Sequence, residues 1–408
     1  MTVIPEVLHK KAVDATFEQT SVPDIFHFLS TFGESNSPDE LIEWLVFVGD
    51  HGMAPVVRRS AQSPIYAGEG IFKMATKGAA IKEKTFHSEE DVNKCLSSDP
   101  VRAKAAMKII LSKNEQLARR NMRRQDWLAS QIFFNRGVVN YQDKEGSVWT
   151  LDYQVPDSHY KKLSGGTVWG DGADRNPLKD VTDAQQRIKV DSGGTVSAMF
   201  INSRTLADRL SGDEDIQKLL QANAFYQGQN LLTNPEGALS AYLKVMKIIK
   251  YDEFMPYSMK IINRVDASTY QVDDPWAVVP GSEVVFKSTD RTGQKLYQDE
   301  LGVIASIDLT TSQIVLENPL TKIFNQRDDK IHASIPFLQD DRIILMAETI
   351  PDGAVCEWIN SPMGIPTKYG LQSKTWEEPD PDGVFVRAQN FGLWALKSNQ
   401  CFYTLDVA

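Results

Sequence analysis

The amino-acid sequence predicts an α+β fold that carries a small all-β insertion. The stretch from Val101 to Arg136 contains no glycine or proline and repeats its apolar residues at helical spacing, which predicts one long helix. From 181 to about 271, helical and strand patterns alternate, as is typical of a compact α/β unit. Between 272 and 333 the sequence changes to short strands and turns, which indicates a separate β-rich insertion.

The composition is that of a globular chain with enough apolar residues for a large core. The 408 residues are 42% hydrophobic and 24% charged, and their formal net charge is −10. An acidic chain repels nucleic acid at long range, which argues against sequence-specific DNA binding. The N-terminus lacks the apolar region of a signal peptide, and no apolar run is long enough to span a bilayer. We therefore expect no membrane partner.

The first 90 residues predict two elements that do not build a core of their own. Residues 1–45 read as an N-terminal arm with an apolar anchoring patch around Phe26 and Phe28. Residues 46–90 read as an extended hairpin that turns at Ala67–Gly70. This hairpin is too polar to bury a face within its own subunit, so we expect it to lie on a partner or in solvent. Its candidate contact residues are Arg58, Arg59 and Lys73.

The long helix has clear start and stop signals. Asp99 suits the N-cap, Pro100 suits the first helical position, and Gly137 can end the helix. The apolar stripe consists of Ala106, Ile110, Leu117, Leu128 and Ile132. The opposite face is basic, with Arg119, Arg120, Arg123 and Arg124. Three interpretations of this face stay open: a solvated surface, a docking surface for an acidic segment of a neighbour, or a nucleic-acid contact.

The glycine-rich segment from Ser164 to Ala184 invites a phosphate-binding interpretation, but its pattern fails the tests. It lacks the Gly-x-x-x-x-Gly-Lys-Ser/Thr string of a phosphate loop and the third glycine of Gly-x-Gly-x-x-Gly. We interpret it as a crossing between two domains. Trp169 is expected to be buried against the long helix, and Asp180 or Thr182 is expected to cap the helix that follows.

No residue pattern predicts a catalytic, cofactor or metal site. Cys95, Cys356 and Cys401 lack zinc-site spacing and read as buried thiols in a reducing compartment. The six histidines are scattered without the His-x-x-x-His spacing of zinc proteases. The nearest match to a calcium loop starts at Glu378 and has Gln389 at the position that needs a bidentate glutamate. We expect no calcium at Asp380 and Asp382.

The β-rich insertion has three strands that can be placed from sequence. They are Ser282–Phe286, Gly302–Leu309 and Ser312–Leu320, and the turn between the last two predicts a hairpin. A block of about 60 residues is near the lower limit for independent folding, so we expect it to lean on its neighbour. Its predicted small core consists of Val284, Phe286, Ile304, Ile307, Ile314 and Leu316.

Several strings, in order along nearly the whole chain, resemble one family. GGTVWGDGADRNPLKDVTDAQQRI is similar to the Gly-Gly-Thr-x-Trp segment of the lambda-type major capsid proteins of tailed phages, the phage major capsid protein E family. TVSAMFINSRTLADRL, IPFLQDDRIILM and TKYGLQSKTWEEPDPDGVFVRAQ resemble later parts of the same family, whereas about 272–333 does not.

The resemblance implies the Hong Kong 97 phage capsid fold. Its parts would be an N-terminal arm (1–45), an extended loop hairpin (46–90), a peripheral domain with a long spine helix (91–180), an apical domain (181–271 and 334–365), the β-rich insertion (272–333), and C-terminal strands of the peripheral domain (366–408).

The implied function is that of the major capsid protein of a tailed double-stranded DNA phage. Such a subunit assembles with itself into pentamers and hexamers, forms an icosahedral head, and encloses DNA without sequence specificity. Portal, scaffolding and decoration proteins are the implied further partners. The implied locations are the virion and, during assembly, the host cytoplasm. Two alternatives remain: an encapsulin-like bacterial compartment of the same fold, and an α/β enzyme whose site is assembled from distant residues.

Overall fold

The structure is a computed structural model of the chain. It describes residues 5–48, 71–142, 148–222, 235–273, 275, 278, 283–288, 299–308, 311–324, 329–351, 353–364, 367–379 and 382–408. Contacts divide the chain into two compact units. Unit 1 is Met1–Lys250 with Asp340–Ala408, and unit 2 is Tyr251–Gln339.

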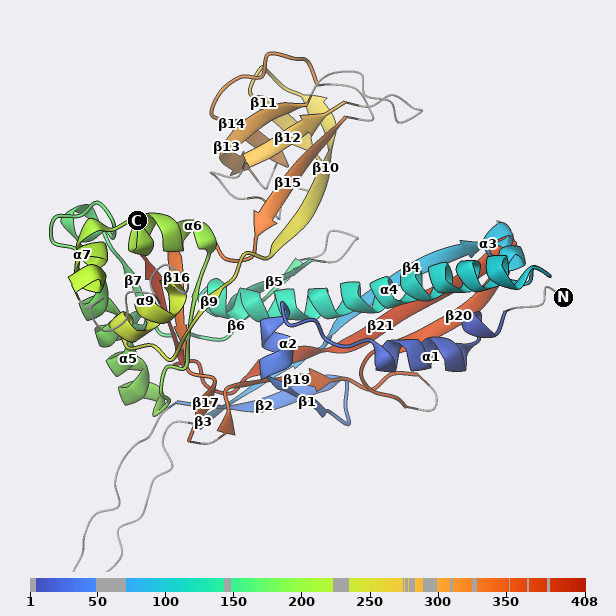
Figure 1. Ribbon diagram of the computed structural model, residues 1–408, viewed down its shortest axis with the longest axis horizontal. Helices are drawn as coiled ribbons and strands as arrows, with labels where there is room; N and C mark the ends of the chain where they lie inside the picture. The colour runs from blue at the N-terminus through green and yellow to red at the C-terminus, as the bar shows by residue number, and fades with distance from the viewer. Residues whose placement is uncertain are drawn as a thin grey trace, which may run out of the picture. The chain divides into compact units, whose positions relative to one another are not determined.

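Unit 1 mixes helices and strands along its whole length (Figure 1). Its helices are η1 (Glu6–Leu8), α1 (Lys10–Gln19), α2 (His27–Thr31), α3 (Glu89–Cys95), α4 (Pro100–Phe134), η2 (Asp157–His159), η3 (Gly165–Thr167), α5 (Pro177–Ser192), α6 (Ser203–Thr205), η4 (Leu206–Ser211), α7 (Glu214–Ala222) and α9 (Pro235–Leu243). Its strands are β1 (Gly33–Asn36), β2 (Leu41–Phe47), β3 (Ile71–Lys77), β4 (Ala79–Ser88), β5 (Val138–Gln142), β6 (Val148–Asp152), β7 (Tyr160–Lys162), β8 (Ala198–Ile201), β9 (Lys247–Lys250), β16 (Arg342–Met346), β17 (Thr349–Ile350), β18 (Gly353–Ala354), β19 (Cys356–Asn360), β20 (Gln372–Pro379), β21 (Asp382–Leu396) and β22 (Phe402–Asp406).

The long helix α4 confirms the prediction for 101–136. The Asp99 carboxylate accepts a hydrogen bond from the Val101 N–H at 3.0 Å, and Pro100 opens the helix. The predicted stripe faces inward: Ile110 and Leu117 pack in one cluster with Leu8 of η1 and with β21. Helix α4 lies along the sheet that contains β21 and β4 (Figure 1).

Two five-stranded sheets organise unit 1. The first has the order β1-β19-β21-β20, and β4 also pairs with β21. The second has the order β7-β22-β16-β8-β9, with α5 and α9 packed on its core cluster. The resemblance places β22 among the C-terminal strands of the peripheral domain with the long helix, whereas in the structure it lies inside the second sheet between β16 and β7.

An aromatic cluster joins the C-terminal end of α4 to the second sheet. Phe28 of α2 stacks on Phe133 of α4 with ring centroids 5.3 Å apart, and on Phe200 of β8 at the same separation. Phe133 also contacts Phe402 of β22 at 5.2 Å. The Asp126 carboxylate of α4 accepts hydrogen bonds from the Phe28 and Leu29 backbone N–H groups. This cluster confirms the anchoring patch around Phe28.

The N-terminal segment is more deeply integrated than the sequence predicted. The sequence predicts an arm without a core role, whereas Leu8, Val13 and Phe17 are buried in the core cluster of α4 and β21. Its helix α1 contributes an apolar face, which a scan of the first forty residues for long apolar runs does not detect.

In the described part of residues 46–90, the strand pairing differs from that of the predicted hairpin. β3 pairs with β2, with Leu45 opposite Lys73, and β4 pairs with β21 rather than with the preceding strand. β2 alternates between buried and exposed residues, so one face of the β2–β3 ribbon has core contacts and the other does not. Residues 49–70, which include the predicted turn, lie outside the described residues.

Unit 2 is a closed six-stranded barrel. Its strands are β10 (Phe254–Arg264), β11 (Thr269–Val272), β12 (Glu283–Lys287), β13 (Glu300–Asp308), β14 (Gln313–Leu316) and β15 (Lys330–Pro336). They close in the order β10-β11-β14-β13-β12-β15. The predicted hairpin is confirmed as β13–β14, and all six predicted core residues belong to the barrel cluster, with Ile307 at its partly buried edge.

The barrel is larger than the predicted insertion. It extends from Tyr251 to Gln339, whereas the sequence placed the insertion at 272–333 and left β10 and β11 in the α/β unit. Met259, Ile261 and Tyr270 of these two strands are buried in the barrel core. The change in sequence pattern at 272 coincides with the end of β11, inside the barrel, and does not mark where the barrel begins.

Candidate functional site

The glycine-rich segment forms a tight loop in which Gly172 is needed for close packing. A Cβ on Gly172 would lie 2.3 Å from the Gly166 carbonyl oxygen and 2.4 Å from that of Val168. The helix that follows, α5, begins at Pro177, and the Asn176 side chain accepts a hydrogen bond from the Lys179 N–H at 3.0 Å. The predicted cap at Asp180 or Thr182 is therefore wrong by about one helical turn.

Trp169 is fully buried, as predicted, but its neighbours are not those of the long helix. It packs in the cluster of α5 and the second sheet with Val181, Ile188 and Leu405. Its indole N–H donates to Asp180 at 3.0 Å, and Lys161 forms an ion pair with the same carboxylate at 2.7 Å. Asp180 thus orients the indole instead of capping a helix.

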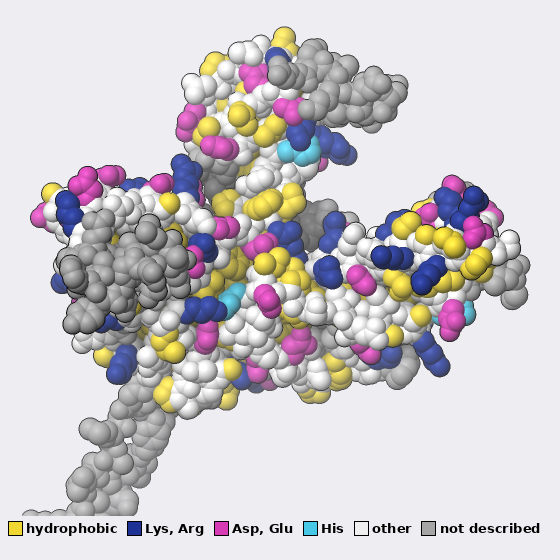
Figure 2. Space-filling model, in the orientation of Figure 1, with side chains coloured by type: hydrophobic (Ala, Val, Ile, Leu, Met, Phe, Trp, Pro, Cys, Tyr) yellow, Lys and Arg dark blue, Asp and Glu magenta, His cyan; other side chains and the backbone are white. Residues whose placement is uncertain are grey.

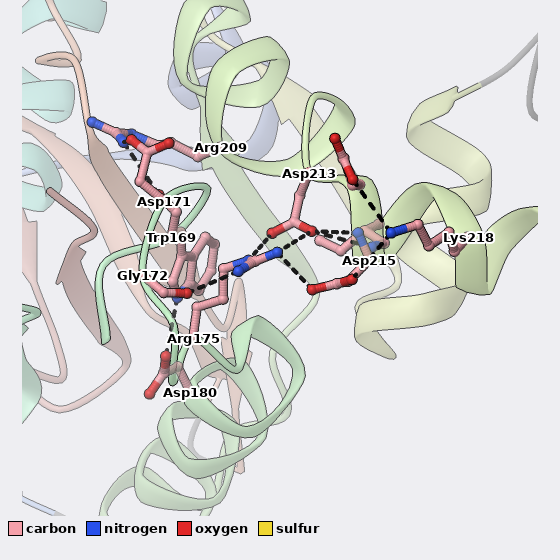
Figure 3. A network of polar contacts seen from close by, with 11 residues as sticks. Trp169, Asp171, Gly172, Arg175, Asp180, Arg209, Asp213, Asp215 and Lys218 are labelled. Carbon is pink, nitrogen blue, oxygen red and sulfur yellow. Dashed lines mark hydrogen bonds and ion pairs between the residues drawn. The ribbon is translucent and has the colours of Figure 1, made fainter. Parts of the chain in front are cut away.

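Arg175 ties the loop to the start of α7 (Figure 3). Its guanidinium donates to both carboxylate oxygens of Asp213, at 2.5 and 3.2 Å, and to Asp215 at 2.6 Å. Asp213 in turn accepts from the backbone N–H groups of Asp215 and Ile216. Burial raises the pKa of Asp213, but the hydrogen bonds from Arg175 and these N–H groups outweigh that effect and lower the pKa.

Arg209 makes a second clamp on the same loop (Figure 3). Its guanidinium donates to Asp341 at 2.7 Å, to the Trp169 carbonyl oxygen at 3.2 Å and to Asp171 at 3.3 Å. Both arginines are thus held by carboxylates of the chain itself. This arrangement joins three segments that are far apart in the sequence. Because both guanidinium groups are already paired with carboxylates, neither is available to bind a phosphate.

The described residues offer little else that resembles catalytic chemistry. They contain no group of three or more His, Cys, Asp or Glu side chains placed to hold a metal ion. The three cysteines are buried and free, as predicted, and burial raises the pKa of both Cys356 and Cys401. The side chains at Asp380 and Asp382 lie outside the described set. Among the described residues, no helix is long and apolar enough to cross a membrane.

The predicted contact residues of the 46–90 hairpin are only partly described. Arg58 and Arg59 lie outside the described residues. Lys73 of β3 is exposed and forms an ion pair with Glu43 of β2, with 2.5 Å between the ammonium nitrogen and the carboxylate oxygen. This pair links the two strands of the ribbon on its outer face.

The four arginines of α4 do not share one environment. Arg119 is exposed. Arg120 forms an ion pair with Glu83 of β4 at 2.6 Å, so part of its charge is matched within the subunit. The Arg124 guanidinium lies 4.0 Å from the centre of the Trp127 ring. Arg123 is partly buried. The structure places all four within residues 119–124 of α4 but does not test whether they contact a neighbour.

Exposed apolar side chains mark two surfaces that the sequence analysis did not single out. Figure 2 shows apolar side chains gathered over the N-terminal part of α4, on the right, among lysines and arginines. The outer face of the β2–β3 ribbon is a second such surface. The exposed residues are Leu96, Val101, Met107 and Ile109 on the first surface, and Leu41, Leu45 and Ile71 on the second. Val101 has the highest exposed fraction of these residues, 76%. Contiguous exposed apolar patches, as opposed to single residues, mark interaction surfaces.

The sequence contains a pattern that indicates the exposed apolar residues of α4. Val101 and Ile109 lie off the stripe defined by Ile110 and Leu117, so helical spacing places these two apolar residues away from the buried stripe. The clamps of Arg175 and Arg209 had no such signal, because their carboxylates lie 38 or more residues away.

Comparison with known proteins identifies the fold and the family. The chain resembles the crystal structure of a phage-related protein of Bordetella bronchiseptica RB50, with a TM-score of 0.51, 10% identity and coverage of 100% of this chain and 98% of that one. It also resembles a protein of Escherichia coli CFT073 assigned as a prophage capsid protein, with a TM-score of 0.52, 12% identity and coverage of 98% and 99%. No curated protein sequence matches the chain.

The sequence profile of the phage major capsid protein E family matches residues 12–294, which is more than half of the chain. The fold expected from the resemblance is confirmed by the two structures. The family is a family of structural proteins of the tailed-phage capsid and not of enzymes. The chain belongs to the phage major capsid protein E family.

Proposed function

We propose that this chain assembles with copies of itself into hexamers and pentamers, and that these build the icosahedral head of a tailed phage. The single observation that carries the proposal is the exposed apolar surface on α4 and on the β2–β3 ribbon. A subunit in solution loses stability by exposing such surfaces, whereas a lattice of subunits covers them. Family membership supports self-assembly, and the exposed surfaces supply candidate contacts.

The predicted basic residues fit the same proposal. We infer that Arg58, Arg59 and Lys73 on the extended segment, and Arg119, Arg120, Arg123 and Arg124 on α4, lie at or near subunit contacts. Exposed ion pairs contribute only about 0–1 kcal/mol each. A closed lattice repeats every contact many times, so small contributions are enough to direct assembly.

The remaining partners follow from the role. We propose that double-stranded DNA fills the shell without sequence-specific contacts, which suits a chain of net charge −10. The portal and scaffolding or decoration proteins are further proposed partners, with assembly in the host cytoplasm before the virion forms. We propose that unit 2 projects from the outer surface, because packed DNA occupies the interior and neighbouring subunits occupy the lattice.

The purified full-length chain tests the proposal directly. Light scattering after size-exclusion chromatography should detect hexamers, pentamers or closed shells, and negative-stain micrographs should show rings or spherical particles. An enzyme of this fold class would instead remain a small oligomer. If the chain stays monomeric at high concentration and under conditions that favour association, the proposal is wrong.

A further inference from the structure

The first sheet of unit 1 has two different faces. Along β21, Val384, Val386 and Ala388 are buried against the cluster of α4. The alternate residues Phe385 and Arg387 point to the other face, because successive side chains of a strand leave the sheet on opposite sides. Within the part of the chain that the structure describes, α4 is the long helix that contacts β21, and it contacts the first face.

A groove of about 900 Å³ lies on this second face, where β4, β20, β21 and the segment after β19 meet. Its lining contains one carboxylate, that of Glu40. Six cationic side chains line the groove: Lys10, Lys77, Lys82, Lys368, Lys374 and Arg387. A basic groove of this kind is unexpected in a chain with a net charge of −10. The groove therefore favours an anionic occupant.

Most of these cations have no acidic partner among the residues that the structure describes. Lys10 forms an ion pair with Asp14 at 3.0 Å. Within the residues that the structure describes, the other five groove cations form no ion pair, and Lys82 instead lies 4.5 Å from the centre of the Phe391 ring. Their charges are available to a ligand.

Two lining residues also carry one buried side-chain atom each that has no hydrogen-bond partner among the described residues. Ser361 is 5% exposed, and neither its hydroxyl oxygen nor the Arg387 Nε atom has a partner among the described residues. Buried donors are almost always paired in folded proteins, so such atoms need an explanation. A carboxylate in the groove can accept from both donors, and guanidinium–carboxylate hydrogen bonds are among the stronger ones in proteins.

The same sheet ends in an acidic hairpin. Residues 377–382 read Glu-Glu-Pro-Asp-Pro-Asp, with four carboxylates in six residues. β20 and β21 stay paired up to Pro379 and Asp382, beside α3 (Figure 1). Lys374 is opposite Arg387 in this ladder. Five residues at about 3.4 Å each place the end of the hairpin roughly 17 Å beyond that pair.

This geometry prevents the hairpin from reaching its own groove. The ladder is continuous from Lys374 to Pro379, so the acidic end cannot fold back over the same sheet without breaking its strand pairing. The acidic end and the basic groove are complementary in charge but cannot meet within one subunit. They can meet only between two copies, in a head-to-tail contact that joins two different surfaces.

We propose that the groove binds the acidic end of the β20–β21 hairpin, residues 377–382, from a second copy of this chain. The proposal rests on the proposed function, because it names one contact of the self-assembly. A head-to-tail contact either closes into a ring or continues from subunit to subunit, as a shell requires. DNA phosphates would also suit the cations, but the chain itself supplies a matching segment that has no route to its own groove.

A peptide assay tests the groove independently of assembly. The probe is a fluorescein-labelled peptide of residues 375–386, measured by anisotropy against full-length chain held as unassembled subunits. We expect binding that weakens at least tenfold when the four carboxylates are replaced by amides. The same loss is expected with intact peptide and the Lys82→Glu/Lys374→Glu variant. Equal binding of the acidic and amide peptides would overturn the proposal.

A charge exchange tests the contact in the shell. The groove variant Lys82→Glu/Lys374→Glu and the hairpin variant Glu377→Lys/Glu378→Lys should each lose assembly. The chain that carries all four substitutions should regain it, because its groove and hairpin are again opposite in charge. Circular dichroism and melting of each variant show whether it is folded, and Lys82→Gln/Lys374→Gln provides a milder groove variant. Folded single-surface variants that assemble like the natural chain would refute the contact.

Failure of this contact is distinguishable from failure of the proposed function. If the natural chain forms shells but the charge exchange does not restore them, the contact is wrong and the capsid role stands. If the natural chain forms no assembly at all, the capsid role is wrong whatever the peptide does. If a labelled DNA duplex binds the groove and the peptide does not, the occupant is nucleic acid and the proposal is overturned.

Discussion

Trp169 is the residue on which the packing of the glycine-rich loop depends. Its side chain is fully buried between α5 and the second sheet, and its N–H donates to Asp180. Among the residues of the loop, Trp169 is the one that belongs to this core cluster. Arg175 and Arg209 then hold the backbone around it through Asp213 and Asp341.

Truncation of this ring should destabilise unit 1 strongly. Trp169→Ala is expected to lower the free energy of unfolding by about 3–5 kcal/mol, the usual cost of removing a large buried aromatic side chain. Urea denaturation of unassembled subunits, followed by circular dichroism, gives this value. Trp376→Ala removes a partly exposed ring from the sheet and is the matched control, with a smaller expected loss. Equal losses for the two variants would contradict the role assigned to Trp169.

The lowered pKa of Asp213 predicts how stability responds to acid. Its carboxylate has a lower pKa in the folded chain than in the unfolded chain, so the unfolded chain binds the proton more readily. The stability that Asp213 contributes is therefore present above the ordinary carboxyl range, about pH 4, and is lost as the pH falls through the lowered folded value. Asp406, hydrogen-bonded to Arg342 and Tyr160, acts in the same direction.

The variant Asp213→Asn should flatten this acid response. Asparagine keeps an oxygen that can accept from the Asp215 and Ile216 N–H groups, but it does not titrate. Between pH 5 and pH 3, the melting temperature of the natural chain should fall more steeply than that of the variant. The matched control is Asp157→Asn, at a carboxylate whose side chain is 98% exposed. A slope unchanged by Asp213→Asn would rule out this origin of the acid sensitivity.

At the scale of elements, the barrel is the part of the chain that can be removed as a whole. Its first and last strands pair with each other, with Phe254 opposite Pro336, and the Phe337 N–H donates to the Glu253 carbonyl oxygen at 2.8 Å. The chain therefore enters and leaves the barrel at neighbouring positions. This pairing defines where a deletion must begin and end.

Two deletions should have opposite outcomes. Replacing 254–336 with a short Gly/Ser linker removes every strand of the barrel and should leave soluble unit 1 that still forms capsomers. Replacing 276–330 instead leaves β10 and β11 without most of their partner strands and exposes Met259, Ile261 and Tyr270. That product should aggregate. Soluble yield after centrifugation compares the two, and an insoluble product from the first deletion would mean that unit 1 needs the barrel to fold.

The sequence predicted those elements that depend on local spacing. The limits and buried stripe of α4 followed from its N-cap and from the period of Ile110 and Leu117, and the hairpin β13–β14 followed from its turn. Strand partners did not follow, because pairing joins distant segments: β22 lies beside β7, and β4 lies beside β21. For the same reason the neighbours of Trp169 and the groove cations Lys368 and Arg387 were missed.

At the scale of the whole molecule, charge reversal on α4 tests assembly apart from folding. Arg119 is exposed and forms no ion pair within the described residues, so Arg119→Glu should leave the subunit folded. If α4 lies at a subunit contact, the variant should reduce shell formation several-fold, as counted in negative-stain micrographs. Lys189→Glu, at an exposed lysine of α5, is the matched control. Full assembly of both variants would remove Arg119 from the set of contact residues.

The adjacency of the barrel's two ends also bears on folding kinetics. β8 pairs with both β9 and β16, and these two flanking strands precede and follow the barrel in the chain. If the segment of about 90 residues between them is unfolded, the entropic part of the free-energy cost of closing the loop is about 4 kcal/mol. For an effective loop of about ten residues this cost is about 2 kcal/mol. If the barrel folds first, its adjacent ends hold β9 and β16 close together and so reduce this cost. Replacing it with an unstructured linker of equal length should slow refolding of the second sheet, while a short linker should not.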